Sequence, residues 1–408
     1  MATTSYPKSK IKVLLLENIH KDAVKFLKNE TFQIECVSTS LDEEELAKRI
    51  KDVHVLGIRS KTKITNTVLA NADKLLTIGA FCIGTNQIDL EACMTKGVAV
   101  FNAPYSNTRS VVELALGEMI MLLRRTFDRS TEIHNGKWNK SAKNSYEIRG
   151  KKLGIVGYGN IGSQLSILAE ALGMQVLYYD VVEKLALGNA QKCNNLKELL
   201  TKSDIITIHV DGNPDNVNII GDKEFSLMKK GVIFLNLSRG SVVEIKSLAK
   251  HIKNKKVAGA AIDVYPEEPK SSNAEFDSGL RNLPNLILTP HVGGSTEESQ
   301  KNIAEYVPQT MINYINRGNS YGSVNFPNIR LIPQVNAHRF LHIHKNVPGV
   351  MGKVNSILAK YDLNIVGQHL KTNEEIGYLV SDVNKNYNKK VISDLKKVKG
   401  TVKFRVLY

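Results

Sequence analysis

Short apolar runs alternate with amphipathic segments through the first quarter of the chain, and this alternation predicts how it folds. Each run is short, which is typical of a buried strand rather than of a buried helix. Strands that alternate with helices predict a parallel, doubly wound sheet of the α/β class. The expected strands are residues 12–16, 32–37, 53–58, 75–79 and 98–101.

A second alternating region follows a long helical stretch at residues 110–125. Its apolar runs predict a second parallel sheet. A further helix at residues 297–317 is expected to return to the first sheet, so that the first domain is discontinuous. We predict a domain of residues 1–106 and 293–334, with a second domain of residues 107–292 inserted in it.

The last segment has a different pattern. An alternating run at residues 340–344 precedes an amphipathic helix at residues 347–361, and then two strands, a lysine-rich helix and a final strand follow. This βαββαβ order predicts a ferredoxin-like domain over residues 335–408. The stretch Pro333–Asn336 before it is interpreted as a linker.

A glycine-rich turn at Gly157–Gly162 lies between an expected strand, residues 152–156, and an expected helix, residues 163–172. This is the context that a dinucleotide-binding turn requires, because the amides at the start of such a helix bind phosphates. Asp180 ends the next strand, where its carboxylate can accept hydrogen bonds from ribose hydroxyls and would repel a 2′-phosphate. Turn and acid together indicate NAD rather than NADP.

Three polar residues further along carry candidate chemistry. His291 follows the apolar run at residues 286–289, so it would lie at the carboxyl end of a strand, where ligands bind in open α/β sheets. A histidine can take a hydroxyl proton near neutral pH, and Glu268 could orient the ring and raise its pKa. Arg239 could hold a substrate carboxylate. Taken singly, each of these three residues could have a purely structural role. Together they suit hydride transfer on a small anionic 2-hydroxy acid.

Four further stretches make the chain similar to the D-isomer-specific 2-hydroxyacid dehydrogenase family: residues 81–87, 101–104, 106–111 and 325–327. The resemblance implies a Rossmann-type NAD domain inserted in a flavodoxin-like substrate domain, followed by an ACT regulatory domain. It also implies that Arg239, Glu268 and His291 are catalytic. The cofactor-binding residues that it implies are Gly157, Gly159, Asn160, Ile161, Gly162, Asp180, Leu237, Ser238, Asp263, Gly293 and Gly294.

Within that family the chain resembles the branch that oxidises 3-phosphoglycerate at the start of serine biosynthesis. The resemblance implies substrate contacts from Arg59, Ser60 and Asn107. Arg59 and Lys61 follow an expected strand, and two cations there suit a doubly anionic ligand. An ordinary basic loop is the alternative interpretation of this segment.

By the same resemblance the ACT domain binds L-serine as an effector. The matching positions are His344, Asn346 and Asn364, the last contributed across a subunit interface, although such residues also form turns. ACT domains commonly pair between subunits, and we expect a homotetramer. The hinge before this domain reads Asn336-Ala337 where relatives have two glycines, which predicts a stiffer hinge and weaker inhibition.

Composition narrows the remaining possibilities. The 408 residues include 55 Lys or Arg and 40 Asp or Glu, which gives a net charge of +15. Lysines near the C-terminus are scattered, which favours a solvated surface over a nucleic-acid site. No apolar run approaches the roughly 20 residues that span a bilayer. The four cysteines lack metal-type spacing, so we expect no bound metal and reduced thiols in the cytoplasm. The N-terminus has no apolar signal core, and we expect no membrane partner.

Two other functions fit parts of the pattern. A glyoxylate or hydroxypyruvate reductase would share the fold and the catalytic residues. A non-enzymatic, NAD-sensing protein of the corepressor type would share the fold alone. The set of Arg239, Glu268 and His291, together with the ferredoxin-like segment, favours the enzyme that oxidises 3-phosphoglycerate.

Overall fold

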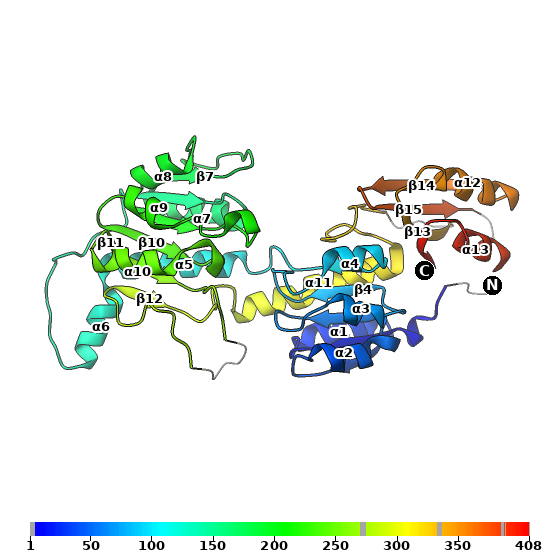
Figure 1. Cartoon of the computed structure of the whole chain (residues 1–408), viewed down its shortest axis with the longest axis horizontal. Coiled ribbons are helices and arrows are strands. Elements are labelled where there is room, and N and C mark those ends of the chain that lie inside the picture. Colours follow the sequence, from blue (N-terminus) through cyan, green and yellow to red (C-terminus); the bar gives the residue numbers. More distant parts are fainter. Residues whose placement is uncertain (1–4, 270–274, 333–336, 385–386, 388, 408) are drawn as a thin grey trace. The chain divides into compact units, whose positions relative to one another are not determined.

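The computed structural model describes residues 5–269, 275–332, 337–384, 387 and 389–407. The chain divides into two compact units. Unit 1 comprises Met1–Ser106 and Gln300–Tyr408, and unit 2 comprises Asn107–Ser299. Each unit contains a parallel sheet covered by helices (Figure 1).

Unit 1 holds a five-stranded parallel sheet in the order β2-β1-β3-β4-β5. Its elements are β1 (Lys12–Leu15), α1 (Lys21–Asn29), β2 (Gln33–Cys36), α2 (Glu43–Arg49), β3 (Val55–Ile58), α3 (Asn66–Ala70), β4 (Thr77–Ala80), α4 (Leu90–Thr95), β5 (Ala99–Phe101) and α11 (Glu297–Arg317). In β1, Val13 and Leu15 pack with α1 and α11, whereas Leu14 packs with α2, α3 and α4. Burial of both faces explains why these strands are continuous apolar runs.

Unit 2 holds a seven-stranded sheet in the order β12-β11-β10-β9-β6-β7-β8, and its strand pairs are parallel. Its elements are α5 (Thr108–Arg124), α6 (Thr126–His134), β6 (Lys152–Val156), α7 (Asn160–Ala171), β7 (Gln175–Tyr179), β8 (Gln191–Lys192), α8 (Leu196–Lys202), β9 (Ile205–Ile208), α9 (Asp222–Leu227), β10 (Val232–Asn236), α10 (Ile245–Lys253), β11 (Val257–Ile262) and β12 (Leu286–Leu288). Helices α5 and α7 cover one face, and α8, α9 and α10 cover the other. Strand order reverses at β6, the position where open α/β sheets bind ligands.

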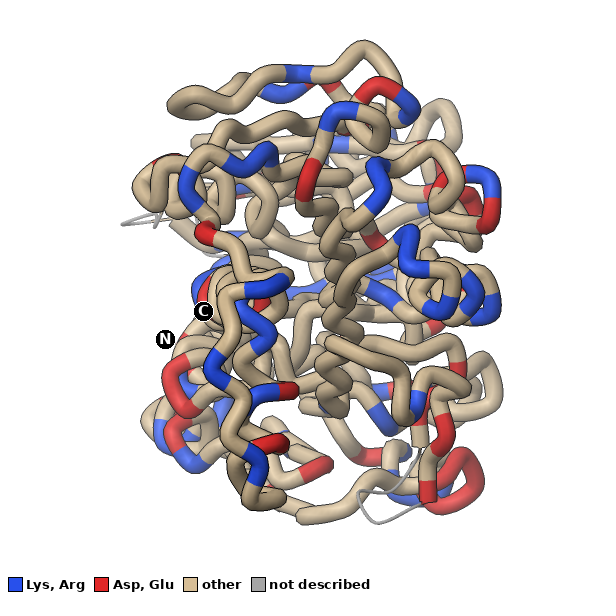
Figure 2. The backbone as a smooth tube through the Cα atoms, turned by 90° about the vertical axis from the view of Figure 1, so that its left-hand side faces the viewer, with Lys and Arg blue, Asp and Glu red and all other residues tan. Residues whose placement is uncertain are grey.

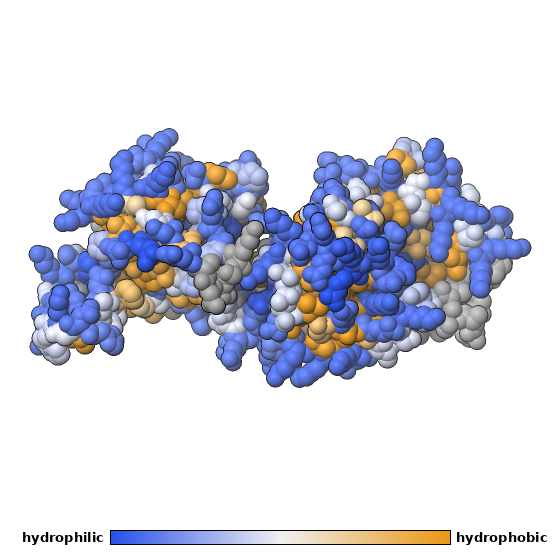
Figure 3. Space-filling view, turned by 60° about the horizontal axis from the view of Figure 1, so that its bottom comes forward, coloured by the Kyte–Doolittle hydropathy of each residue, from blue (hydrophilic) through white to orange (hydrophobic). Residues whose placement is uncertain are grey.

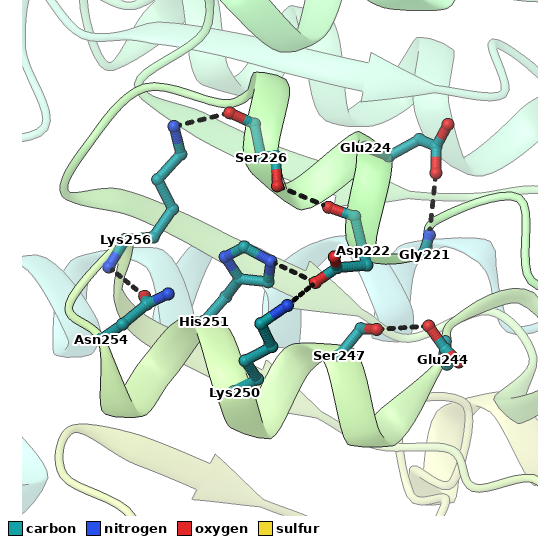
Figure 4. Close-up of polar contacts among 10 residues, drawn as sticks. All are labelled: Gly221, Asp222, Glu224, Ser226, Glu244, Ser247, Lys250, His251, Asn254 and Lys256. Carbon is teal, nitrogen blue, oxygen red and sulfur yellow. Dashed lines mark hydrogen bonds and ion pairs between the residues drawn. The ribbon is translucent and has the colours of Figure 1, made fainter.

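Polar contacts join α9 to α10, two helices that cover the same face of the unit 2 sheet (Figure 4). The carboxylate of Asp222 accepts hydrogen bonds from Lys250 Nζ at 2.8 Å and from His251 Nε2 at 2.9 Å. The His251 ring is buried and stacks on Phe225. Hydrogen bonds to Asp222 and the stacking of His251 on Phe225 therefore hold the two helices together.

The C-terminal segment of unit 1 forms a four-stranded antiparallel sheet in the order β14-β15-β13-β16. Its elements are β13 (His338–Lys345), α12 (Val350–Lys360), β14 (Ile365–Thr372), β15 (Ile376–Val383), α13 (Lys389–Lys396) and β16 (Thr401–Val406). Phe340 packs with α12 and α13, whereas Leu341 and Ile343 pack with α11. Tyr378 Oη also donates to the Gly318 carbonyl at 2.8 Å. The sheet thus has two buried faces, one on its own helices and one on α11.

The structure confirms the predicted class, an α/β fold with a C-terminal βαββαβ unit. The expected helix at residues 297–317 matches α11, while the helix expected at residues 163–172 begins earlier, at Asn160. The three predicted domains remain a prediction, because the division into compact units groups residues 300–408 with residues 1–106. The predicted linker, Pro333–Asn336, lies outside the described residues.

The visible face of each unit is mostly hydrophilic, with apolar patches between the polar side chains (Figure 3). Among the described residues, no helix has both the length and the apolar content needed to cross a membrane. The same residues contain no group of three His, Cys, Asp or Glu side chains placed to hold a metal ion.

Candidate active site

The glycine turn folds tightly at the end of β6. Gly157 has a φ of 93°, and a Cβ there would lie 2.4 Å from the His209 carbonyl oxygen. A Cβ on Gly162 would lie 2.3 Å from the carbonyl oxygen of Gly157. Gly159 faces open space, and α7 begins directly after it without a side-chain cap on its first amides. Glycine is therefore required at two positions, and the turn leaves a cradle of amides that fits a pyrophosphate.

Asp180 follows β7 and faces this turn. Its carboxylate accepts hydrogen bonds from the backbone N–H of Tyr158 at 2.8 Å and of Val182 at 2.9 Å. Because a carboxylate has about four acceptor sites, it can still accept from the two hydroxyls of a ribose. The predicted Asn160 and Ile161 form the first turn of α7, beside the same cradle.

His291 and Glu268 form a pair at the carboxyl edge of the unit 2 sheet. His291 Nδ1 lies 2.8 Å from Glu268 Oε2, and the histidine side chain is 48% exposed. This hydrogen bond raises the pKa of His291, although burial opposes the change. Burial acts to raise the pKa of Glu268, but its contacts with His291 outweigh that and lower it. A carboxylate can only accept, so Nδ1 carries the proton and Nε2 is left as the basic nitrogen.

Arg239 directly follows the segment after β10, and its position is held by backbone contacts. Its Nη1 donates to the Ser238 carbonyl at 2.7 Å, and its own carbonyl accepts from Asn236 Nδ2 at 2.9 Å. The charge of Arg239 contributes to the lowered pKa of Glu268 and opposes the raised pKa of His291. The structure therefore brings the three predicted catalytic side chains within electrostatic reach of one another. The predicted Leu237 and Ser238 are buried beside them.

Asp263 is the anchor of the segment that carries His291. Its carboxylate accepts hydrogen bonds from Thr289 Oγ1 at 2.6 Å and from the N–H groups of Val292 and Gly293, both at 2.8 Å. Its carbonyl accepts from the N–H of His291 at 2.7 Å. A cofactor contact for Asp263 stays a prediction, whereas the structure shows that Asp263 holds the segment that carries His291.

The segment after His291 packs against the start of α5. A Cβ on Gly293 would lie 2.9 Å from Asp263 Oδ2, and a Cβ on Gly294 would lie 2.1 Å from Asn107 Nδ2. Ser110 Oγ and Thr296 Oγ1 are 2.8 Å apart. Asn107, predicted to contact substrate, is thus also part of the packing beneath this segment.

Arg59 and Ser60 lie in unit 1, just after β3. The loop is held by Glu17, whose carboxylate accepts hydrogen bonds from the N–H groups of Arg59 at 3.2 Å, Lys61 at 3.0 Å and Thr62 at 2.9 Å. Sequence reasoning did not single out Glu17, because its distance of more than forty residues from the loop hides the contact. Among the described residues, Glu17 accepts only from backbone N–H groups, so it does not engage the side chains of Arg59 and Lys61.

The predicted effector residues lie at two ends of the C-terminal sheet. His344 is buried, and its Nδ1 lies 2.8 Å from the Lys345 carbonyl oxygen while its Nε2 has no partner among the described residues. Asn346 follows at the same end, where its Nδ2 donates to the Asn373 carbonyl at 2.7 Å. Asn364 precedes β14 at the other end, next to the pair of Ile365 and Val383. One chain therefore brings His344 and Asn346 together but not Asn364.

A buried acid near the catalytic segment escapes sequence reasoning. Glu118 in α5 is 2% exposed, and neither of its carboxylate oxygens has a hydrogen-bond partner among the described residues. Burial, reinforced by the charge of Asp263, raises the pKa of Glu118 to about 8. In the sequence it looks like any polar residue of an amphipathic helix.

Comparison with known proteins identifies the same parts of the chain. Residues 116–293 match the family described as D-isomer specific 2-hydroxyacid dehydrogenase, NAD binding domain. Residues 340–403 match the family described as AHAS small subunit-like ACT domain. The first match contains the glycine turn and the catalytic candidates, so the cofactor of this chain is NAD.

Full-length relatives extend this result. The D-3-phosphoglycerate dehydrogenase of Dictyostelium discoideum is 50% identical over 406 residues, 100% of this chain and 99% of its own. That of Escherichia coli K12 is 46% identical over 411 residues and covers 100% of both chains. Among solved structures, D-lactate dehydrogenase from Aquifex aeolicus, complexed with NAD and lactic acid, is 25% identical with a TM-score of 0.67 and covers 78% of this chain and 100% of its own.

A glyoxylate reductase from Paecilomyes thermophila is 26% identical with a TM-score of 0.69, over 77% of this chain and 98% of its own. The two solved structures thus share the fold over about three quarters of the chain, while the sequence match to the full-length relatives extends over the whole chain. With this coverage and identity, the chain belongs to the D-isomer specific 2-hydroxyacid dehydrogenase family and is an NAD-dependent dehydrogenase.

Proposed function

We propose that the chain oxidises 3-phosphoglycerate to 3-phosphohydroxypyruvate, the first step of the phosphorylated route to L-serine. The observation that carries the proposal is the Glu268–His291 pair beside Arg239, in a chain whose full-length relatives are D-3-phosphoglycerate dehydrogenases. NAD, when bound at the glycine turn, supplies the hydride acceptor. The remaining chemistry falls to side chains of the protein.

His291 Nε2 takes the proton of the substrate C2 hydroxyl, because Nδ1 is committed to Glu268. The carboxylate of Glu268 stabilises the imidazolium that forms and keeps the ring oriented. Arg239 holds the substrate carboxylate and polarises the carbonyl as it develops. Arg59, Ser60 and Asn107 are proposed as further substrate contacts, since a second anionic group needs additional donors.

The test is the initial rate of NADH formation with 3-phosphoglycerate compared with glycerate. We expect a clear preference for 3-phosphoglycerate, because Arg59 and Lys61 offer cations that only a phosphorylated substrate uses. Replacing His291 with Ala should lower kcat by roughly 10²–10⁴, the usual contribution of a general acid–base, with NADH binding unchanged. Faster reduction of glyoxylate or hydroxypyruvate would instead assign the chain to the reductases, and NAD binding without turnover would indicate a sensor.

We further propose that L-serine binds the C-terminal sheet and inhibits turnover. Lys345 pairs with Ile376 and Ile365 pairs with Val383, so Asn346 and Asn364 lie at opposite ends of β15. At roughly 3.4 Å per residue these ends are about 24 Å apart, too far to share one amino acid. A site with both asparagines therefore needs a second copy of the chain. The unpartnered Nε2 of buried His344 supports a ligand there.

The serine site is tested by turnover against serine concentration for wild type, Asn346→Ala and Asn364→Ala. We expect both variants to lose inhibition and to keep their serine-free rate. If millimolar serine leaves the wild type unaffected and calorimetry detects no binding, the serine site is wrong while the dehydrogenase remains.

A homotetramer in the cytoplasm is the proposed working form. Apolar side chains of α6 and the following loop are exposed, among them Phe127, Ile133 and Trp138, the last at 82%. Such a patch is typical of a subunit contact. The four cysteines, all described, form no disulfide, as expected of a reducing compartment. Sedimentation equilibrium and a fluorescent fusion test the two proposals, and a monomer or a secreted fusion would contradict them.

A further inference from the structure

Unit 2 contains two buried acidic side chains among its described residues, Glu118 at 2% exposure and Asp263 at 1%. Other Lys, Arg, Asp and Glu positions are spread over many helices and loops (Figure 2). Burying an ionised carboxylate is costly unless hydrogen bonds or a cation compensate it. The two acids differ in this respect, because Asp263 accepts three hydrogen bonds through its carboxylate and neither oxygen of Glu118 has a partner among the described residues.

Contacts near both ends of α5 show where Glu118 lies. Ser110 Oγ is 2.8 Å from Thr296 Oγ1, and the Leu122 carbonyl accepts from Asn285 Nδ2 at 3.2 Å. The helix therefore runs antiparallel to β12, from the carboxyl edge of the sheet toward its amino edge. Glu118 is one helical turn before Leu122, which is about 6 Å closer to the carboxyl edge.

The surroundings of Glu118 contain few titratable groups. Strands β10, β11 and β12, on which α5 packs, contain none, and α7 contains only Glu170, which accepts from the N–H of Asn189. The titratable side chains within electrostatic reach are Asp263 and Tyr265. Burial, reinforced by Asp263, raises the pKa of Glu118 to about 8. Near neutral pH the acid is therefore close to the point at which a further charge decides its protonation.

The carboxyl edge is also where the reacting end of the cofactor must lie. The hydride leaves the carbon whose hydroxyl proton His291 accepts, so the ring that takes the hydride lies beside His291. The Asp263 carbonyl accepts from the N–H of His291 at 2.7 Å, which puts Asp263 next to that position. The nicotinamide ring is a cation in NAD and neutral in NADH. A cation at this edge favours the ionised form of Glu118, because opposite charges attract.

We propose that Glu118 changes its charge with the oxidation state of the cofactor, losing its proton when NAD binds and holding it when NADH is bound. The proton goes to solvent when NAD binds and returns from solvent once the hydride has neutralised the ring. Only the O–H bond of the acid breaks and forms. Glu118 thereby stabilises bound NAD relative to bound NADH. The inference rests on the proposed role of His291 for the place of the ring.

The experiment measures the dissociation constants of NAD and NADH by calorimetry between pH 6.5 and pH 9. The full-length wild type is compared with Glu118→Gln and with Glu113→Gln, a control on the same helix whose side chain is 60% exposed and pairs with Arg109. The quantity compared is the ratio of the two affinities, and the contribution of His291 to it cancels between variant and control. No substrate is present, so failure to oxidise 3-phosphoglycerate would refute the proposed function without affecting this test.

We expect the affinity for NAD relative to NADH to rise with pH roughly five- to tenfold more in the wild type and in Glu113→Gln than in Glu118→Gln, as a change of about one unit in the pKa of one carboxyl group predicts. At pH 7.5, NAD binding should release about half a proton more from the wild type than from Glu118→Gln, measured in two buffers with different heats of ionisation.

Infrared spectroscopy of the wild type gives a second measurement that needs no variant to fold. The band of a protonated, buried carboxyl group should be present in the NADH complex and weaker in the NAD complex, and Glu118→Gln should lack it. A purely structural role for Glu118 predicts the same pH dependence in all three proteins. That result, or a carboxyl band that is equal with NAD and with NADH, would overturn the proposal.

Discussion

Replacing Glu118 with Gln should make the protein more resistant to heat, and increasingly so as the pH rises. The carboxyl group is 2% exposed, has no hydrogen-bond partner among the described residues and lies near the charge of Asp263. Burial raises its pKa to about 8, above the ordinary value of 4.5. Glutamine keeps the shape of the protonated acid but never ionises, so it removes only the cost of the charge.

The sign and size of the effect follow from proton linkage. Between pH 4.5 and 8 the folded chain keeps a proton on Glu118 that the unfolded chain has lost, so stability falls as the pH rises. The fall is about 1.4 kcal/mol per pH unit for one group. From pH 5.5 to pH 7.5 the wild type should therefore lose roughly 3 kcal/mol that the Gln variant keeps. For a domain of this size that corresponds to roughly 5–10 °C in Tm.

The assay is differential scanning calorimetry of wild type and variant at both pH values. The quantity of interest is the change in the Tm difference between the two proteins, because all other titrating groups cancel in it. Glu113→Gln is the control, since Glu113 lies on the same helix but its side chain is 60% exposed and pairs with Arg109. A Tm difference that is the same at both pH values would show that Glu118 is ionised at little cost and refute the reasoning.

Three other changes probe the site and the fold. Glu268→Gln should lower the pKa of His291 and move the rise of kcat/KM with pH to lower pH, because the raised pKa rests on the carboxylate; an unmoved pH profile would count against the pair. Asp180→Ala should weaken the preference for NAD over NADP, measured as the ratio of kcat/KM values, and a wild type that already prefers NADP would contradict the assignment. Arg339→Leu should cost about 3–5 kcal/mol in a denaturant titration, because it leaves the fully buried carboxylate of Asp382 without its 2.7 Å partner; a loss below 1 kcal/mol would refute that estimate.

Local patterns were sufficient for the order and type of the elements and for naming candidate chemistry. The strand at residues 152–156 and the helix at residues 297–317 match the structure residue for residue, because burial and helical spacing are visible in the chain itself. The turn at Gly157 was predictable from its glycine, because a φ of 93° admits few other residues. His291 was identified by its place after a strand, and Glu268 as the carboxylate that could orient its ring. The structure places the two side chains 2.8 Å apart.

Only the tertiary structure decided which residues far apart in the sequence contact one another. Glu17 holds the loop of Arg59, and Asp263 holds the segment of His291, through backbone contacts that have no sequence signature. Glu118 looks like a solvated helix residue in the sequence, and only packing buries it near the charge of Asp263. A side chain's type and spacing fix its local conformation, but its pKa and its partners depend on burial and on charges brought close by the fold, and these arise only when the sheets and helices pack.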